Sequence, residues 1–411
     1  MENKNLIVIE PNTSSGIFLL ESAKRNGITV YAVTHQNLYE EEYPEYVKTL
    51  IDGVYFTDFK NQKKCVQQII DYFKFMSIDG VVTGFEFTSD IAILVARGLG
   101  LPTHELNNIN SLRNKFEMYL EFSKNDIPCA KTEIVSSWDE CLEKHSNFAF
   151  PFIVKPVSNA GSCGVKLVNN LLELEDAFKN IQMLGDEFPH GIPLSSDVLL
   201  QEYLIGDEYS VECAMGGGNF FVLGITDKFT TDDNFFAETS HIFPSSLNTE
   251  KKEQISKCVL KLLKSFKLTN GVAHVEVMMT NNGPKVIEIG ARLPGDYIPR
   301  LIFNALGINQ ASLYIKAAFG LQVSPEYKTD LISGITFIQS TVVGHFKSID
   351  GLKKINRDNY IQDIYLLPGD LIKTPSDNID RIGHIIITEN TYSKTRDNLE
   401  NSKKNLTINI N

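Results

Sequence analysis

The chain has 411 residues, of which 43% are hydrophobic and 22% are charged. This composition is typical of a folded globular protein and excludes a mainly disordered chain. The formal net charge of −12 argues against a nucleic-acid-binding surface, because a surface that binds phosphate backbones needs the opposite sign. The chain is too long for one ordinary core, and we expect three domains.

No segment has the pattern of a membrane span or of a secretion signal. The apolar run near the start stops at Glu10 and Pro11, and no run approaches the length of a transmembrane helix. The cysteines are scattered without a C-x-x-C pair, which predicts reduced thiols. We therefore expect a cytoplasmic protein with no membrane and no nucleic-acid partner.

The first hundred residues alternate apolar strands with amphipathic helices. The expected strands are 5–10, 28–34 and 79–85, and the expected helices are 17–27, 63–76 and 89–100. This order predicts β-α-β units and a parallel, Rossmann-like sheet. Ligands of such sheets bind at the carboxyl ends of strands, where Ser14, Ser15, Gly16 and Glu86 fall. The first loop, "NTSSG", lacks the G-x-G-x-x-G pattern of an NAD site.

The organisation changes near residue 110, where a polar connection leads into a helix predicted at 115–125. The strands expected after it are 150–156, 198–204, 208–219, 220–229, 272–280 and 284–292. Their order favours an α+β domain over a second parallel sheet. From about residue 326, short strands and a helix-like tail predict a small β-rich domain.

The stretch "PFIVKPVSNAGSCGV", residues 151–165, places Lys155 in an apolar run before a loop of small residues. Pro156 favours extended backbone at Lys155, so a strand that carries a partly buried lysine is predicted. Such a lysine must extend its ammonium group to water or meet an anion, and the glycines that follow are typical of a loop whose backbone N–H groups bind phosphate. An ordinary strand and loop is the alternative.

Residues 198–208, "VLLQEYLIGDE", combine a strand with a short linker and two acids. The pattern resembles a hinge in which the backbone of Glu202 to Leu204 binds the edge of adenine and Glu208 binds ribose. A plain β-hairpin that turns at Gly206 fits the same letters.

Two acids within residues 272–292 are predicted to face each other. If residues 281–283 form a three-residue hairpin loop, Glu276 lies opposite Glu288. Facing carboxylates repel, so a cation is expected between them, and Mg²⁺ held by both acids and by phosphate is the economical choice. Alternation also places Arg292 on the face of Glu288, where it can clamp a carboxylate or a phosphoryl group. The alternative is a solvent-facing hairpin.

Four segments, in this order, resemble the ATP-grasp superfamily of ATP-dependent carboxylate–amine ligases. They are "RNKFEMYLEFSKNDIPCAKT", "FPFIVKPVSNAGSCGV", "LLQEYLIGDEYSVE" and "HVEVMMTNNGPKVIEIGARLPGD". The resemblance covers most of residues 1–325 and implies an ATP-grasp fold of mixed α/β and α+β class. The implied domains are a preceding α/β domain at 1–110, a catalytic domain at 111–325 with a lid subdomain at about 133–205, and a C-terminal domain at 326–411.

The resemblance also implies ligands. ATP is the implied nucleotide, and Mg²⁺ or Mn²⁺ is the implied metal, with Glu276 and Glu288 as its ligands. Many members have an asparagine where this chain has Gly290. The residues to which the resemblance assigns ATP contacts are Lys115, Lys155, Ser158, Gly161, Ser162, Gly164, Glu202, Tyr203, Leu204 and Glu208.

A narrower similarity is to the L-amino acid ligases, which make dipeptides. "AETSHIFP" reproduces their Glu-x-x-His pair at Glu238 and His241, and "GARLPGD" reproduces their arginine at Arg292. Asp296 stands where some members have an aromatic residue, so we expect a preference for a cationic or polar substrate side chain. The implied substrate contacts are Glu86, Lys228, Gly295 and Asp296.

The implied reaction forms an acyl phosphate from a carboxylate and ATP, after which an amine displaces phosphate. Arg292 would stabilise the transferring group, and Glu238 or His241 would accept a proton. The implied partners are small-molecule carboxylates and amines, amino acids above all, and a second copy of the chain.

Two other functions are consistent with the same motifs: an ATP-grasp ligase or carboxylase of another pathway, and a nucleotide-binding regulator without turnover. At single positions, His241 can be a structural histidine, Glu238 a surface acid and Lys228 an exposed strand end.

Overall fold

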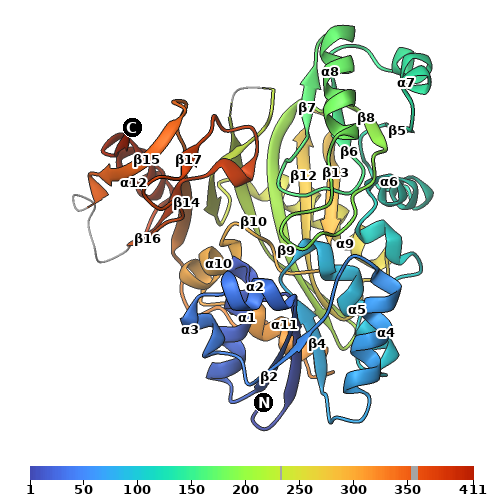
Figure 1. The fold of residues 1–411 in the computed structure, drawn as a ribbon, viewed down its shortest axis with the longest axis vertical. Helices are drawn as coiled ribbons and strands as arrows, with labels where there is room; N and C mark the ends of the chain where they lie inside the picture. Colours follow the sequence, from blue (N-terminus) through green and yellow to red (C-terminus); the bar gives the residue numbers. More distant parts are fainter. Residues whose placement is uncertain (232–233, 353–359) are drawn as a thin grey trace.

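The computed structural model describes residues 1–231, 234–352 and 360–411. The chain starts with a four-stranded parallel sheet in the order β3-β2-β1-β4, coloured blue in Figure 1. Its elements are β1 Asn5–Ile9, α1 Ser14–Arg25, β2 Thr29–Thr34, α2 Gln36–Glu41, α3 Glu45–Lys48, β3 Gly53–Phe56, α4 Gln62–Phe73, β4 Gly80–Thr83, η1 Glu86–Thr88 and α5 Ser89–Gly98.

Successive side chains of β1 point to opposite faces of this sheet, and helices cover both faces. Leu6 and Val8 pack into the cluster that contains α1, whereas Ile7 and Ile9 pack with α4 and α5. The predicted β-α-β units are therefore confirmed. Strand β3 and the short helices α2 and α3 were not predicted, because β3 has four residues, none of them fully buried, and carries no clear apolar run.

A small antiparallel sheet, which we call the lid sheet, follows the first domain and lies at the top of Figure 1. Its order is β5-β8-β6-β7. The chain enters it through η2 Ile109–Leu112 and α6 Lys115–Lys124, and the lid elements are β5 Thr132–Val135, α7 Trp138–Lys144, η3 His145–Asn147, β6 Phe152–Pro156, β7 Lys166–Val168, α8 Leu171–Gln182 and β8 Val198–Glu202. Apolar residues of α8 and of the strands form a core of its own.

The centre of the molecule is an eight-stranded sheet in the order β13-β12-β9-β10-β11-β14-β18-β16. The helix α9 packs on one face of the central strands and the helices α10 and α11 pack on the other. Its elements up to residue 318 are β9 Gly206–Gly216, β10 Asn219–Thr230, β11 Glu238–Phe243, α9 Thr249–Ser265, β12 Gly271–Thr280, β13 Gly283–Gly290, α10 Ile298–Leu306 and α11 Gln310–Ala318.

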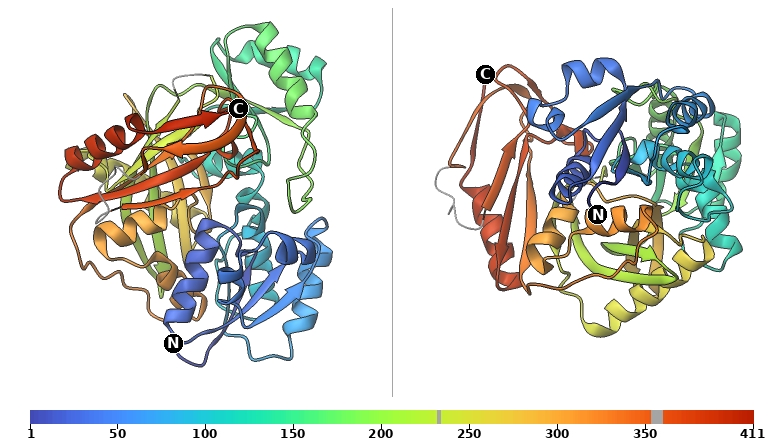
Figure 2. Two further views of the ribbon diagram at one scale, coloured as in Figure 1. Left: turned by 60° about the vertical axis from the view of Figure 1, so that its left-hand side comes forward. Right: turned by 90° about the horizontal axis from the view of Figure 1, so that it is seen from below.

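The C-terminal strands extend this same sheet. β11 pairs with β14 at Ser240 and Thr336, so the chain after residue 326 shares hydrogen bonds with the preceding domain. A three-stranded sheet, β17-β15-β19, lies beyond it, in red in Figures 1 and 2. The elements are β14 Ile332–Ile338, β15 Gly344–Asp350, β16 Tyr360–Ile364, β17 Leu371–Ile372, η5 Asn378–Asp380, β18 Gly383–Glu389, α12 Tyr392–Lys404 and β19 Thr407–Ile410. None of the helices in the described part of the chain combines the length and the apolar character needed to cross a membrane.

The linker between β8 and β9 connects two different sheets. β8 pairs with β5 and β6 in the lid sheet, whereas β9 pairs with β10 and β12 in the central sheet. The alternative of a β-hairpin that turns at Gly206 is therefore wrong, and residues 203–205 join the lid sheet to the central sheet.

The hairpin of β12 and β13 brings Glu276 opposite Glu288, as predicted, but its loop differs. Thr280 pairs with Gly283, so the loop has two residues rather than three. A bulge on the β13 side at Ile287 then shifts the register by one residue and restores the pairing of the two acids.

Two glycines of the first domain lie in close contact, beside a hydrogen bond that reaches the central domain. A Cβ atom on Gly84, which follows β4, would lie 2.4 Å from the backbone nitrogen of Gly16 in α1. The neighbouring Ser15 hydroxyl donates to the carbonyl of Pro294, in the loop after β13. The glycine contact fixes the start of α1 at the carboxyl end of the parallel sheet, and the hydrogen bond of Ser15 joins it to the loop that carries Arg292.

We expect Gly84→Ala to lower the free energy of unfolding by about 1–3 kcal/mol, because the added methyl group meets backbone atoms that cannot move aside. Gly185→Ala is the matched control: a Cβ atom there meets no atom within 4 Å, and a change within about 0.5 kcal/mol is expected. Urea denaturation measures both values. Equal stabilities of the two variants would contradict the close approach.

Candidate active site

A cavity of about 300 Å³ is lined by residues of the first domain, the lid sheet and the central sheet, and by Asn378 from the C-terminal part of the chain. It brings together most of the residues singled out from the sequence. These are Glu86, Lys115, Lys155, Gly161, Ser162, Glu202, Tyr203, Leu204, Glu208, Lys228, Glu238, His241, Glu276, Glu288, Arg292, Gly295 and Asp296.

Two of the predicted ATP contacts, Ser158 and Gly164, do not line the cavity. The Ser158 hydroxyl accepts a hydrogen bond from the backbone N–H of Ser195 at 3.1 Å. Gly164 has a φ of 79° and packs so closely that a Cβ atom would lie 2.9 Å from the ring of Pro156. Both residues shape the loop after Lys155, and their direct contact with ATP stays a prediction.

Lys155 lies on β6, pairs with Leu199 of β8 and is 6% exposed, as its apolar surroundings predicted. Burial, reinforced by the positive charge of Lys115, lowers the pKa of Lys155 to about 8. The loop that follows has left-handed backbone at Gly161 and Ser162. A buried cation therefore lies beside a loop that turns tightly, which suits an anionic ligand.

Lys115 is the first residue of α6, where the side chain of Asn114 caps the helix by accepting two backbone N–H bonds. The backbone N–H of Lys115 donates to the carbonyl of Val157 at 2.9 Å, which ties the helix to the end of β6. Its Nζ donates to Glu288 Oε1 at 2.5 Å. The two lysines therefore reach the cavity from adjoining elements.

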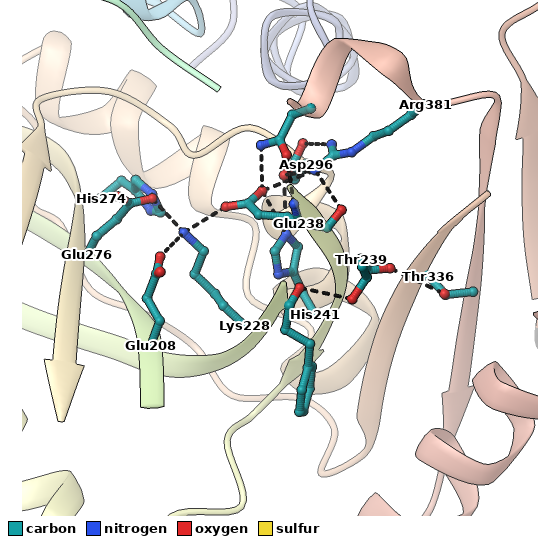
Figure 3. Close-up of polar contacts among 12 residues, drawn as sticks. Glu208, Lys228, Glu238, Thr239, His241, His274, Glu276, Asp296, Thr336 and Arg381 are labelled. Atoms are coloured by element: carbon teal, nitrogen blue, oxygen red, sulfur yellow. Dashed lines mark hydrogen bonds and ion pairs between the residues drawn. The ribbon is translucent and has the colours of Figure 1, made fainter. Parts of the chain in front are cut away.

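Lys228 of β10 lies at the centre of a group of acids from three neighbouring strands (Figure 3). Its Nζ is 2.6 Å from Glu208 of β9, 2.8 Å from Glu238 of β11 and 2.6 Å from Glu276 of β12. The side chain is 3% exposed, so the alternative of an exposed strand end is wrong. Burial alone would lower the pKa of Lys228, but the three carboxylates outweigh it and hold the pKa well above its usual value.

A second group of charges continues from Glu238 toward the C-terminal part of the chain (Figure 3). His241 Nε2 lies 3.2 Å from Asp296 Oδ2 and 3.5 Å from Glu238 Oε2. Arg381 donates to both oxygens of Asp296, at 2.5 and 3.0 Å, and to Glu238 at 3.1 Å. Asn378 donates to the carboxylate of Glu238 at 2.8 Å. The alternative of Glu238 as a surface acid is therefore wrong.

Burial is the largest single effect on the pKa of Glu238 and of His241, but in each case the charged and hydrogen-bonding partners together outweigh it. Burial raises the pKa of Glu238, but the ammonium of Lys228 outweighs it, so the pKa lies well below its usual value. Burial lowers the pKa of His241, yet hydrogen bonds to Asp296 and Glu238 raise it above its usual value.

Arg292 binds Glu86, the acid that follows β4 in the first domain. Arg113 lies 3.6 Å from the other oxygen of Glu86. Burial raises the pKa of Glu86, but the two arginines outweigh it and lower the pKa. Gly290 leaves room for this pair, since a Cβ atom there would lie 3.3 Å from a carboxylate oxygen of Glu86. The strand ends at Gly290, and Arg292 still lines the cavity.

Apolar side chains also line the cavity, and one of them, Leu204, belongs to the linker between the two sheets. Ile153, Met278 and Ile287 are three others. The carboxylate of Glu202 accepts hydrogen bonds from Lys285 at 3.0 and 3.1 Å. An apolar slot next to an extended linker can hold a flat ring and offers backbone groups to its edge.

The pair of acids, Glu276 and Glu288, fits a hard cation. Both line the cavity, and an ammonium group binds one oxygen of each, from Lys228 and Lys115 respectively. Carboxylate oxygens beside a space for phosphate are the donors that Mg²⁺ prefers. The alternative of a solvent-facing hairpin is therefore excluded for the residues described.

Three contributors to the site were not identified from the sequence. His274 lies 2.8 Å from Glu212 and 3.6 Å from Glu276, and its place two residues before Glu276 on one strand was the available signal. Asn378 and Arg381 belong to the C-terminal segment 376–381, and no local pattern marks them. The backbone N–H of Asn378 also donates to the carbonyl of Gly161 at 3.1 Å, so this segment contacts the loop after Lys155.

Comparison with known families agrees with this architecture. Residues 148–300 match the ATP-grasp domain family, and residues 336–411 match the family described as L-amino acid ligase C-terminal domain 2. The chain therefore carries an ATP-grasp domain followed by an L-amino acid ligase C-terminal domain.

Two of the most similar relatives are less than 30% identical to the chain. Alanine–anticapsin ligase of Bacillus subtilis (strain 168) is 28% identical over 273 residues, which cover 62% of this chain and 57% of that ligase. Dapdiamide A synthase of Enterobacter agglomerans is 26% identical over 254 residues, which cover 61% of this chain and 59% of the synthase. The chain thus matches less than two thirds of the length of either relative.

Solved structures share the whole fold. An L-amino acid ligase from Bacillus licheniformis superposes with a TM-score of 0.82 at 22% identity and covers 100% of both chains. A phosphoribosylglycinamide synthetase from Anaerococcus prevotii superposes with a TM-score of 0.73 at 20% identity, over 99% of this chain and 100% of the other. A carboxylase domain with a TM-score of 0.72 and 15% identity was solved with the magnesium salt of ADP.

The buried ammonium of Lys228 should be required for stability. We expect Lys228→Met to lower the free energy of unfolding by about 3–5 kcal/mol, because three buried carboxylates would lose their shared cation. Lys179→Met is the matched control, since Lys179 forms an exposed pair with Glu175, and no measurable change is expected. Denaturant titrations of both variants at pH 7 provide the comparison, and a stable Lys228→Met variant would contradict the role of this cation.

Proposed function

We propose that this chain, an ATP-grasp protein that carries an L-amino acid ligase C-terminal domain, joins the carboxylate of one L-amino acid to the amine of another at the expense of ATP. One observation carries the proposal: a single cavity is lined by Lys115 and Lys155, by the facing acids Glu276 and Glu288, and by Arg292. Phosphate, a divalent cation and a carboxylate are the ligands that match these groups.

The nucleotide would lie along the lid sheet. Its phosphates would be bound by the ammonium groups of Lys115 and Lys155 and by the loop at residues 159–163. Its adenine would occupy the apolar slot, with the backbone of Tyr203 and Leu204 at its edge. The side chain of Glu202 already binds Lys285, so the backbone there, rather than this carboxylate, is suited to adenine.

Glu276 and Glu288 would hold Mg²⁺, with Mn²⁺ as a substitute. The ion would supply positive charge beside the phosphate oxygens when it is bound. Its binding would require Lys228 and Lys115 to release the carboxylate oxygens that they contact in this structure. Lys115 and Lys155 would then be available to hold phosphate.

The reaction balances in two steps. A carboxylate oxygen of the first amino acid bonds to the γ-phosphorus, and the bond from that phosphorus to the β-phosphate oxygen breaks, which releases ADP. The amine nitrogen of the second amino acid then bonds to the acyl carbon, and the C–O bond to phosphate breaks. Arg292 would stabilise the charge on the transferring group, and positioning would supply most of the acceleration.

The amine must lose a proton before or during its attack. Of the two candidate acceptors, His241 in its neutral form is the stronger base, because its pKa is raised while that of Glu238 is lowered. Glu238 is better suited to bind the incoming ammonium group as an anion. We therefore assign proton acceptance to His241, and binding of the ammonium group to Glu238 together with Glu86.

A turnover assay tests the proposal. With MgATP and pairs of the common L-amino acids, we expect ADP, phosphate and a dipeptide mass, and Glu288→Gln should reduce the rate by about 10²-fold or more because a ligand for the cation is lost. Glu400→Gln, which makes the same chemical change in an exposed ion pair with Arg396, is the control for folding and expression. Release of AMP and pyrophosphate, or ATP binding without turnover for every pair, would contradict the ligase.

The affinity for ATP should depend on the charge of Lys155. Because its pKa is about 8, the amine loses its proton as the pH rises from 7 to 9.5, and the affinity should fall by up to about tenfold per pH unit above 8. Lys155→Arg keeps its charge and should lack this fall. Calorimetry with a non-hydrolysable ATP analogue measures both curves, and parallel curves would contradict the assignment.

A further inference from the structure

Arg381 approaches the candidate active site from the C-terminal part of the chain, 85 residues after Asp296 in sequence. It is 6% exposed, and its guanidinium lies 3.4 Å from the centre of the Phe337 ring. It binds both oxygens of Asp296 and one of Glu238. Ring, backbone and carboxylates together hold the guanidinium in one orientation.

Arg381 lies behind the wall of the cavity. Asp296 and Glu238 line the cavity, whereas Arg381 contacts them from the side of the C-terminal domain, as Figure 3 shows for these three residues. The negative charge that Asp296 presents to a ligand is therefore opposed by a cation from within the protein. The expected preference for a cationic side chain, drawn from Asp296 alone, has to be revised.

Asp296 already has a cationic partner that belongs to the chain itself. Arg381 donates to both of its oxygens, and His241 lies 3.2 Å from one of them. A further cation placed beside Asp296 would therefore meet a carboxylate that is already paired with a guanidinium group, and would gain little. Removal of Arg381 would leave Asp296 without this partner at the cavity wall.

We propose that Arg381 is a specificity-determining residue that makes the substrate pocket at Asp296 select against a cationic side chain. The proposal rests on the proposed ligase function for its substrate class, amino acids. The substrate side chain that lies nearest to Asp296 is the part that is recognised. The group that recognises it is the Asp296 carboxylate, whose charge Arg381 cancels. Arg381 acts through Asp296 and touches no reacting atom.

L-Lysine and L-norleucine form a matched pair of substrates, because their side chains differ only by the terminal ammonium in place of a methyl group. The ratio of kcat/KM for lysine over norleucine is measured at each of the two substrate positions. We expect Arg381→Met to raise this ratio by about tenfold or more at one position. Arg381→Met/Asp296→Asn should return it to the wild-type value, and Arg396→Met, an exposed arginine on α12, should leave it unchanged.

A second variant keeps the test decisive if Arg381→Met fails to fold. Asp296→Asn leaves Arg381 bound to Glu238 but removes the carboxylate that accepts two of its hydrogen bonds, so Arg381 keeps an excess of positive charge. The ratio of kcat/KM for lysine over norleucine should therefore fall below the wild-type value. A ratio that stays constant in folded Arg381→Met or in Asp296→Asn would overturn the proposal.

A binding measurement tests the role of Arg381 independently of ligase activity. If the wild-type protein turns over no amino acid pair, the proposed function fails, and thermal stabilisation by millimolar lysine or norleucine is measured instead. Stabilisation of Arg381→Met by lysine, with none by norleucine and none in the double variant, would support the role of Arg381. Equal responses of all variants to the two amino acids would overturn it.

Discussion

The ammonium of Lys228 holds the central sheet and the site together. It contacts carboxylates from β9, β11 and β12, while its own strand, β10, lies between β9 and β11. Four neighbouring strands therefore share one buried ion. Burial of unpaired carboxylates at these positions would cost much of the free energy of folding. The acids that suit a metal ion and an amine are tolerated only because this lysine compensates their charge.

The same compensation extends in both directions. On one side, Glu276 leads to His274 and to the facing acid Glu288, which Lys115 binds. On the other side, Glu238 leads to Arg381 of the C-terminal segment. The site is thus a connected network of opposed charges from three parts of the chain, and a bound ligand would exchange partners within it rather than enter an empty slot.

Patterns that act over a few residues were predictable from the sequence. Alternation along two strands identified Glu276 and Glu288 as facing acids, and the apolar run before Pro156 identified Lys155 as buried. The bulge at Ile287 was not predictable, because it depends on how the whole hairpin packs. Arg381 was not predictable either, since its partners lie 85 and 143 residues away and nothing near it in sequence marks a site.

The transfer of oxygen from the substrate carboxylate to phosphate tests the central claim most directly. An acyl phosphate forms through a carboxylate oxygen, and that oxygen leaves with the phosphate when the amine attacks. With the carboxylate of the first amino acid labelled with ¹⁸O and MgATP unlabelled, mass spectrometry should find one ¹⁸O atom in each phosphate released. Unlabelled phosphate, or label in AMP, would contradict the account.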